Sequence, residues 1–131
     1  MIALDTNVVV RLLVRDDPAQ TAQAAALVAG NEVFLTTSVL LETEWVLRSR
    51  YRVPRTTILV APRRLFGLDQ LTLDHLAAAA RALDLFEGGL DLADALHLAL
   101  SAATAEFATF DRKLARCARE LGVAPAVRLC G

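Results

Sequence analysis

The chain alternates short apolar runs with longer segments in which apolar residues recur every three or four positions. The short runs predict strands at 2–4, 33–35, 71–73, 107–110 and 126–129. The longer segments predict helices at 7–14, 18–29, 38–50, 54–66, 74–86, 92–103 and 112–121, with proline, glycine and capping residues at their ends. Short apolar strands separated by helices are typical of a parallel sheet that is covered on both faces. The sequence therefore predicts an α/β fold.

Length and composition indicate one folded domain over residues 1–131. Hydrophobic residues make up 55% of the chain, and glycine and proline number only 6 and 4, which excludes a disordered or fibrous protein. No apolar run approaches the roughly 18 residues of a membrane span, and no secretory leader is recognised. The 2 cysteines have neither metal-ligand nor disulfide spacing. We therefore expect a soluble, cytoplasmic protein with no membrane partner.

Two acidic residues directly follow predicted strands. Asp5 comes after the strand at 2–4, and Asp111 comes after the strand at 107–110. In open α/β sheets, ligands bind beyond the carboxyl ends of the strands, so both positions are candidates for a ligand site. Either residue could instead cap the helix that follows it. For Asp5 this alternative is weakened because Asn7 is also available as a cap.

A third acid, Glu42, is expected on an apolar helix face. It shares that face with Val39, Trp45 and Val46, which are its neighbours at helical spacing. Burial of a carboxylate in such surroundings is costly unless a cation or hydrogen-bond donors meet it. A buried arginine partner is the structural alternative to a metal. Glu44 lies about 200° further round the helix and is expected to be solvated.

The fourth acid, Asp94, lies early in the helix at 92–103, at the margin of an apolar face. Its structural alternative is a capping box with Asp91. Four such acids together are harder to explain as four separate caps or ion pairs. Carboxylates without a nearby histidine or thiol suit Mg²⁺ or Mn²⁺ and not zinc. A bound ion of this kind activates water for attack on phosphorus.

Arginine is concentrated in one part of the chain. Six arginines and no acid occur between residues 48 and 64, although the whole chain carries a net charge of −1. Such a cluster is typical of a phosphate-binding surface, but it is equally typical of a solvated helix face, and both interpretations stay open. Lys113 is the only lysine.

Four segments of the chain resemble the motifs of PIN-domain nucleases. Residues 2–7, Ile-Ala-Leu-Asp-Thr-Asn, resemble the opening Asp-Thr-Asn signature. Leu-Glu at 41–42 with Trp-Val-Leu-Arg at 45–48 resembles the second acidic motif. Asp-Leu-Ala-Asp-Ala-Leu at 91–96 resembles the third, and Thr-Phe-Asp at 109–111 resembles the fourth. The length and the lack of appended domains are most similar to the VapC toxins of toxin–antitoxin pairs.

The resemblance implies a three-layer α/β/α PIN-like fold with a short, mostly parallel central sheet. It implies an Mg²⁺- or Mn²⁺-dependent endoribonuclease that forms a homodimer and is bound by a VapB-type antitoxin. The implied catalytic and metal-binding residues are Asp5, Glu42, Asp94 and Asp111. Thr6 and Asn7 would support Asp5 or a metal-bound water, and Thr109 would orient Asp111 or a phosphate. The arginines implied to face RNA or antitoxin are Arg48, Arg50, Arg52 and Arg55.

Other interpretations remain for particular residues and for the whole chain. Asp91 is expected to be a helix cap and His97 a structural residue, although His97 lies one turn after Asp94. Trp45 and Tyr51 are the only Trp and Tyr, so recognition is expected to depend on RNA shape and phosphates. The alternative function is a non-catalytic RNA- or partner-binding module with a structural metal site. Receiver and haloacid-dehalogenase folds fit poorly, because the acids they need near the first strand are missing.

Overall fold

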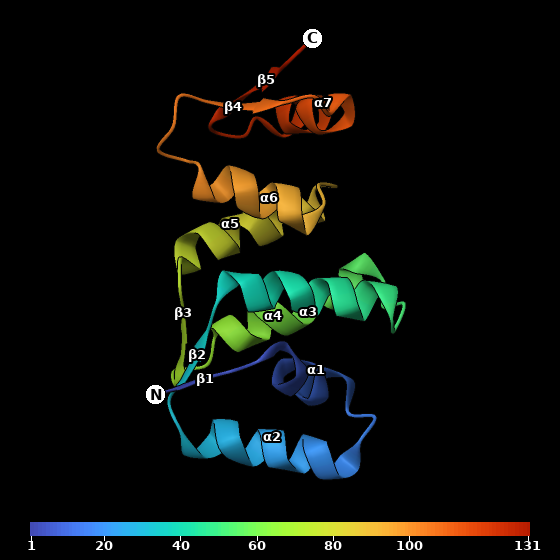
Figure 1. Cartoon of the computed structure of the whole chain (residues 1–131), viewed down its shortest axis with the longest axis vertical. Coiled ribbons are helices and arrows are strands. Elements are labelled where there is room, and N and C mark those ends of the chain that lie inside the picture. Colours follow the sequence, from blue (N-terminus) through green and yellow to red (C-terminus); the bar gives the residue numbers. More distant parts are fainter. The chain divides into compact units, whose positions relative to one another are not determined.

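The computed structural model describes all residues, 1–131, and the chain divides into two compact units. The N-terminal unit is Met1–Leu76, and the C-terminal unit is Ala77–Gly131. Each unit combines helices with short parallel strands (Figure 1). The predicted α/β class with short parallel strands is therefore confirmed, whereas a single domain over the whole chain stays a prediction.

Local capping signals set the helix ends of the N-terminal unit. Asp17 caps one helix by accepting a hydrogen bond of 3.1 Å from the backbone N–H of Gln20. Thr36 caps another by accepting one of 3.2 Å from the backbone N–H of Val39. Such caps satisfy N–H groups that have no partner within the helix. The elements are β1 (Ile2–Ala3), α1 (Thr6–Val14), α2 (Pro18–Gly30), β2 (Val33–Leu35), α3 (Thr37–Ser49), α4 (Arg55–Phe66) and β3 (Leu71–Leu73).

The three strands of this unit form one parallel sheet in the order β1-β2-β3. Ile2 is paired with Val33, and Val33 with Leu71, so the strands start at the same level. The central strand is the most buried, since Val33 and Leu35 are almost inaccessible to solvent. Parallel pairing requires long crossovers, which the helices supply. The carboxyl ends of the strands consequently lie at one edge of the sheet.

The C-terminal unit has a helical core and a pair of parallel strands. Its elements are α5 (Leu76–Glu87, beginning at the unit boundary), α6 (Leu92–Leu100), β4 (Glu106–Thr109), α7 (Arg112–Leu121) and β5 (Ala126–Leu129). β4 and β5 pair along their whole length, from Glu106 with Ala126 to Thr109 with Leu129. The buried side chains come mainly from α5 and α6: Ala79, Ala82, Leu83, Phe86, Leu92, Ala95, Leu96, Leu98 and Ala99.

Two predicted helix limits differ from the structure by two residues or more. α5 begins at Leu76 and not at Asp74, because the Asp74 carboxylate accepts a hydrogen bond of 2.6 Å from the backbone N–H of Thr37. Asp74 therefore ties the end of β3 to the start of α3 and does not cap α5. α6 ends at Leu100, before residue 103, because the chain turns directly afterwards. None of the helices combines the length and apolar content needed to cross a membrane.

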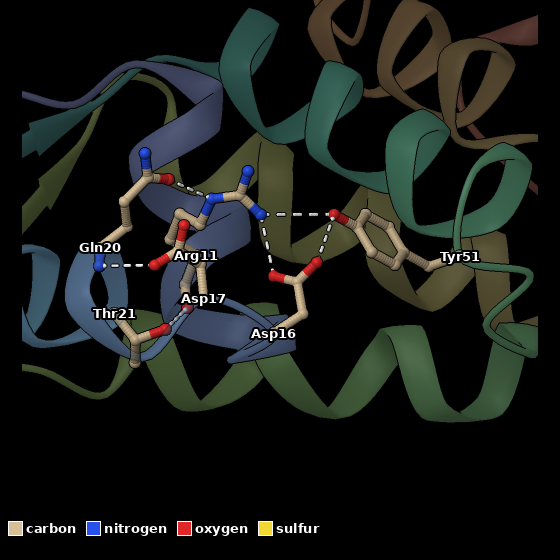
Figure 2. Close-up of polar contacts among 6 residues, drawn as sticks. All are labelled: Arg11, Asp16, Asp17, Gln20, Thr21 and Tyr51. Atoms are coloured by element: carbon tan, nitrogen blue, oxygen red, sulfur yellow. Dashed lines mark hydrogen bonds and ion pairs between the residues drawn. The ribbon is translucent and has the colours of Figure 1, made fainter.

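A polar network connects α1, α2 and the turn after α3 (Figure 2). The Arg11 guanidinium donates hydrogen bonds to Gln20 Oε1 at 2.6 Å and to Asp16 Oδ1 at 2.8 Å. It also donates to the Tyr51 hydroxyl at 3.4 Å, and that hydroxyl donates to Asp16 Oδ2 at 3.2 Å. The bond to Tyr51 and the charge of Asp16 raise the pKa of Arg11. The network holds the turn after α3 beside the end of α1.

Candidate active site

Asp5 lies between β1 and α1, at the carboxyl end of its strand. Its backbone is extended, with φ −79° and ψ 158°, and it occupies the N-cap position of α1. Its side chain makes no capping hydrogen bond and is exposed. Capping therefore does not occupy the carboxylate. Asn7 does not cap the helix as expected, because α1 begins one residue earlier, at Thr6, and Asn7 lies within it.

Thr6 connects the first turn of α1 to α3. The residue is buried, with 4% of its surface exposed, and its hydroxyl donates a hydrogen bond to Glu42 Oε1. The hydroxyl thus engages Glu42, a second predicted metal-binding acid, whereas support of Asp5 or of a metal-bound water by Thr6 stays a prediction. The bond orients the Glu42 carboxylate towards the start of α1, the helix that Asp5 precedes.

The predicted environments of Glu42 and Glu44 are reversed in the structure. Glu42 is exposed apart from its contact with Thr6, whereas Glu44 is only 5% exposed. Both carboxylate oxygens of Glu44 accept hydrogen bonds of 3.2 Å from Nε of Arg48. Trp45, which was predicted to lie on an apolar face, is 51% exposed. The predictions that Glu44 is solvated and that Glu42 shares an apolar face with Trp45 are both wrong.

The reason is a shift in the phase of α3. Its buried stripe consists of Leu40, Thr43, Glu44 and Leu47, at the spacing of one helix face. In the sequence, apolar residues one position before members of this buried stripe form a second stripe. In the structure, the second stripe is the more exposed of the two. α3 packs against α1, so a contact between distant segments decides between the two stripes.

Three aspartates line one small cavity of the C-terminal unit. The cavity has a volume of about 40 Å³, and we call it the acidic cavity. Its lining residues are Gly89, Leu90, Asp91, Asp94, Asp111, Lys113, Leu114 and Cys117. Burial raises the pKa of Asp94, and the negative charges of Asp91 and Asp111 raise it further. The positive charge of His97 opposes this rise. Burial and the neighbouring carboxylates thus disfavour the ionised form of Asp94 in the acidic cavity.

Asp111 lies at the N-cap position of α7. One oxygen accepts a hydrogen bond of 3.0 Å from the backbone N–H of Leu114, so Asp111 is a helix cap as well as a lining residue. The Thr109 hydroxyl accepts a hydrogen bond of 3.0 Å from the backbone N–H of Asp111. Thr109 therefore fixes the backbone from which the Asp111 carboxylate projects. Asp91 is at the N-cap position of α6, but its side chain makes no capping hydrogen bond, so the expected capping function is absent.

The donor chemistry of these acids fits a hard divalent cation. Asp5 and Glu42 belong to the N-terminal unit, and Asp94 and Asp111 belong to the C-terminal unit. All four offer carboxylate oxygens, which Mg²⁺ and Mn²⁺ prefer over sulfur and imidazole donors. No group of three or more His, Cys, Asp or Glu side chains is arranged in the structure to hold a metal ion. The fit therefore rests on the donor type and on the electrostatics of the acidic cavity.

The arginines predicted to bind RNA or antitoxin differ in how far they already interact within the protein. Arg48 forms an ion pair with Glu44 at 3.2 Å, so the charge of that residue is partly compensated. Arg50 and Arg52 are exposed, at the end of α3 and in the turn after it. Arg55 is half-buried at the start of α4 and has interactions within the protein. Arg50 and Arg52 are thus the members of the group best placed to meet a partner.

Two residues of the acidic cavity escaped the sequence analysis. Lys113 lines the cavity because it lies in the first turn of α7, two residues after the Asp111 cap. The position of a lone lysine beside an acidic motif is the signal that could have identified it. Cys117 lines the cavity one turn later, and nothing in its sequence context indicates this.

Comparison with known proteins gives one match. The profile described as PIN domain matches residues 2–120, which include all four predicted acids and extend over parts of both units. Neither the curated proteins nor the solved structures gave a significant match to the chain.

Proposed function

Because the chain belongs to the PIN domain family, whose members are generally nucleases, we propose that it is a metal-dependent endoribonuclease. The observation that carries the proposal is the acidic cavity, where burial and neighbouring carboxylates raise the pKa of Asp94. Perturbed carboxylates in a concave site are typical of catalytic centres. The positions of Asp5 and Asp111 after parallel strands add to this support.

Asp5, Glu42, Asp94 and Asp111 would hold Mg²⁺ or Mn²⁺. When bound, such an ion supplies an activated water and neutralises charge on the phosphate. In the proposed reaction, the water oxygen bonds to phosphorus while the bond from phosphorus to the 3′ oxygen breaks. The 3′ oxygen takes up a proton, which leaves a 5′-phosphate and a 3′-hydroxyl. The ribose 2′-hydroxyl takes no part, so no 2′,3′-cyclic phosphate forms.

The surrounding residues hold these acids in place. Thr6 directs Glu42 through its hydroxyl, and Thr109 fixes the backbone of Asp111. Asn7 lies near the start of α1 and lines a groove with Arg11 and Gln20. That Asn7 also supports Asp5 is part of the proposal. Positioning groups of this kind contribute to catalysis by reducing the motion of the groups that react.

We further propose that the protein is a homodimeric toxin of the VapC type with a VapB-type antitoxin. An apolar groove between α1 and α4, with a volume of about 620 Å³, supports a protein partner. Leu12, Val60 and Leu65 line it, and Arg15 and Arg64 add positive charge. An amphipathic antitoxin segment that carries acidic residues beside its apolar side chains would complement this groove.

The test of the nuclease is incubation of purified protein with total cellular RNA in Mn²⁺, followed by sequencing of new 5′ ends. Asp5→Ala, Asp94→Asn and an EDTA-treated sample would be run in parallel. Asp69→Asn is the matched control, because Asp69 is exposed and outside the predicted site. We expect discrete cuts with 5′-phosphates in the wild type and in Asp69→Asn only.

The competing function is a binding module that keeps a structural metal site. For such a module, Asp94→Asn would change stability while RNA stays intact with every variant. Cutting that persists in EDTA, or products with 2′,3′-cyclic phosphates, would contradict the metal-dependent mechanism. Intact RNA in the presence of folded, antitoxin-free protein would favour the binding module.

A further inference from the structure

We propose that the outer face of α7 binds the phosphate backbone of the RNA and that Phe110, just before the helix, stacks on one of its bases. The inference rests on the proposed function and adds to it a substrate-binding surface outside the four acids. α7 follows β4 almost directly (Figure 1). Asp111 is the N-cap residue of α7, so this surface begins next to one of the proposed metal-binding acids.

The exposed face of α7 is basic along the length of the helix. The buried face consists of Leu114, Ala115 and Ala118. The opposite face carries cations that recur every three or four residues, and we call it the basic face. Its members are Arg112, Arg116 and Arg119, with Lys113 at their edge, and all four are exposed. Glu120 is the only acid within the helix.

The cations of the basic face have no counter-charge within the protein. None of the four side chains forms an ion pair or a hydrogen bond with another residue. By contrast, Arg11, Arg48 and Arg128 are each paired with an acid. The three arginines of the basic face are spaced by about 5 Å along the helix axis, close to one turn. Such a row can meet successive phosphates of one strand, and each phosphate contact releases a counterion.

Helix stability does not explain this placement of charge. Arg112 and Lys113 lie in the first turn of α7, which contains no acid. The helix dipole favours acids in the first turn and cations in the last, so only Arg119 is favourably placed. Residues that break a local rule of stability are expected at functional sites. The cations of the first turn therefore indicate an anionic partner.

Phe110 adds an aromatic ring at the same end of α7. It is 81% exposed, more than any other large hydrophobic residue of the chain. The backbone on both sides of it is hydrogen-bonded, since the Thr109 carbonyl accepts from the N–H of Cys130 at 2.7 Å and the Thr109 hydroxyl accepts from the N–H of Asp111 at 3.0 Å. The exposure of Phe110 is thus built into the junction between β4 and α7.

A single strand of RNA complements both features. Proteins that bind single-stranded nucleic acid combine cations along the backbone with aromatic side chains on which bases stack. The basic face supplies the cations and Phe110 supplies the ring. An acidic protein segment would complement the cations, but it offers no base to stack on Phe110. RNA is therefore the partner that accounts for the whole surface.

The first test removes the cations one at a time. Binding of a fluorescein-labelled single-stranded RNA of mixed sequence would be measured by anisotropy in Ca²⁺ over a series of salt concentrations, with the RNA checked to be intact afterwards. Arg112→Gln, Arg116→Gln and Arg119→Gln should each weaken binding about fivefold near physiological salt and reduce the slope of log Kd against log salt by about 1. Arg64→Gln is the control, because Arg64 is exposed but lines the groove of the N-terminal unit, and it should change neither.

The second test separates stacking from charge. Phe110→Ala should weaken RNA binding about tenfold and leave the salt slope unchanged, because the ring carries no charge. Phe110→Tyr should retain wild-type affinity, whereas Phe110→Leu should not, since it keeps the apolar surface and loses the aromatic face. Leu100→Ala is the control at another exposed apolar residue of the same unit and should bind RNA as the wild type does.

Thermal unfolding distinguishes an RNA contact from a structural role. The Tm of Arg112→Gln should be no lower than that of the wild type, because the substitution removes a cation from the start of a helix. A Tm that falls together with RNA affinity would overturn the assignment of this residue to RNA.

Unchanged RNA affinity and salt slope in all three arginine variants, or an equal loss in Arg64→Gln, would overturn the proposal. Loss of binding to a VapB-type antitoxin with RNA affinity unchanged would overturn it in favour of a protein partner. A wild type that binds RNA through the basic face but does not cut it in Mn²⁺ would contradict the nuclease function while it supports this surface.

Discussion

Thr6 and Glu42 are joined across 36 residues of sequence, because the buried hydroxyl of one donates a hydrogen bond to the carboxylate of the other. Thr6 directly follows Asp5 in the chain, after the end of β1. The bond therefore connects Glu42 to the residue next to Asp5, and Asp5 and Glu42 are both proposed metal-binding acids. A hydrogen bond to a charged acceptor is stronger than one between neutral groups. Thr6 is therefore a positioning residue for Glu42.

Thr6→Val should remove this positioning with little change in side-chain volume. We expect weaker Mn²⁺ binding and a loss of about 1 kcal/mol in the free energy of unfolding, since Glu42 can regain water when the bond is lost. Thr6→Ser keeps the hydroxyl and should retain most Mn²⁺ affinity. Thr72→Val is the control, because Thr72 is exposed on β3. Titration calorimetry with Mn²⁺ and urea unfolding measure the two effects. Wild-type Mn²⁺ affinity in Thr6→Val would show that the bond has no positioning role.

Asp94 should make the stability of the metal-free protein depend on pH. Burial and the charges of Asp91 and Asp111 raise the pKa of Asp94, so the folded state favours its protonated form. This stabilising contribution is complete below the ordinary pKa of 3.8 and is lost as the pH rises through the raised value. Asp94→Asn, which stays uncharged, should therefore be more stable than the wild type at neutral pH.

The measurement is urea unfolding in EDTA from neutral pH towards the ordinary aspartate pKa. The difference between Asp94→Asn and the wild type should shrink as the pH falls, because the wild-type carboxyl becomes protonated. Asp69→Asn is the control at an exposed site and should show no comparable gain. A gain for Asp94→Asn that stays constant over the whole pH range would rule out repulsion among the carboxylates as its cause.

Most of the fold could be predicted because its signals are local. Asp17 and Pro18 mark the start of α2, and Thr36 marks the start of α3. In the structure, Asp17 and Thr36 cap these two helices with their side chains. Asp111 and Thr109 also behave locally, since they interact within the end of β4 and the start of α7. Caps, turns and short apolar strands are recognisable from a few neighbouring residues.

The features that were misjudged or not foreseen depend on contacts between distant segments. The phase of α3 could not be chosen from its own sequence, because two apolar stripes compete and packing against α1 selects the one with Leu40 and Leu47. The partner of Thr6 lies on another helix, and so does the Thr37 amide that draws Asp74 away from α5. Tertiary contacts of this kind leave no periodic signal in the sequence.

Divalent metal should stabilise the protein against heat if the four acids bind it. A ligand that binds only the folded state raises the midpoint of unfolding, and the rise grows with concentration. Mn²⁺ should therefore raise the Tm of the wild type and of Asp69→Asn, but raise it less for Glu42→Gln and Asp94→Asn. Differential scanning fluorimetry with and without EDTA measures this. Equal rises in all four proteins would indicate that Mn²⁺ binds elsewhere.

The network around Arg11 should contribute to stability but not to metal binding. Tyr51→Phe removes the hydroxyl that accepts from Arg11 and donates to Asp16, while it keeps the aromatic ring. Because the network is exposed, the loss of unfolding free energy should be smaller than for Thr6→Val. Urea unfolding of Tyr51→Phe, Asp16→Asn and the double variant gives the coupling between the two residues. Strictly additive effects would show that the contact drawn in Figure 2 carries no energy.

The groove between α1 and α4 should be required for antitoxin binding and not for RNA cleavage. Val60 lines this groove and is 47% exposed, so Val60→Asp adds a charge that repels acidic residues without disturbing the core. Leu100→Asp is the matched control, because Leu100 is also 47% exposed but lies on α6. Each variant would be co-expressed with a VapB-type antitoxin, and the complex would be measured by size-exclusion chromatography with light scattering. Val60→Asp should lose the complex and keep cleavage, whereas Leu100→Asp should keep both. If Val60→Asp instead changes the mass of the free protein from dimer to monomer, the groove holds a second copy of the chain and not the antitoxin.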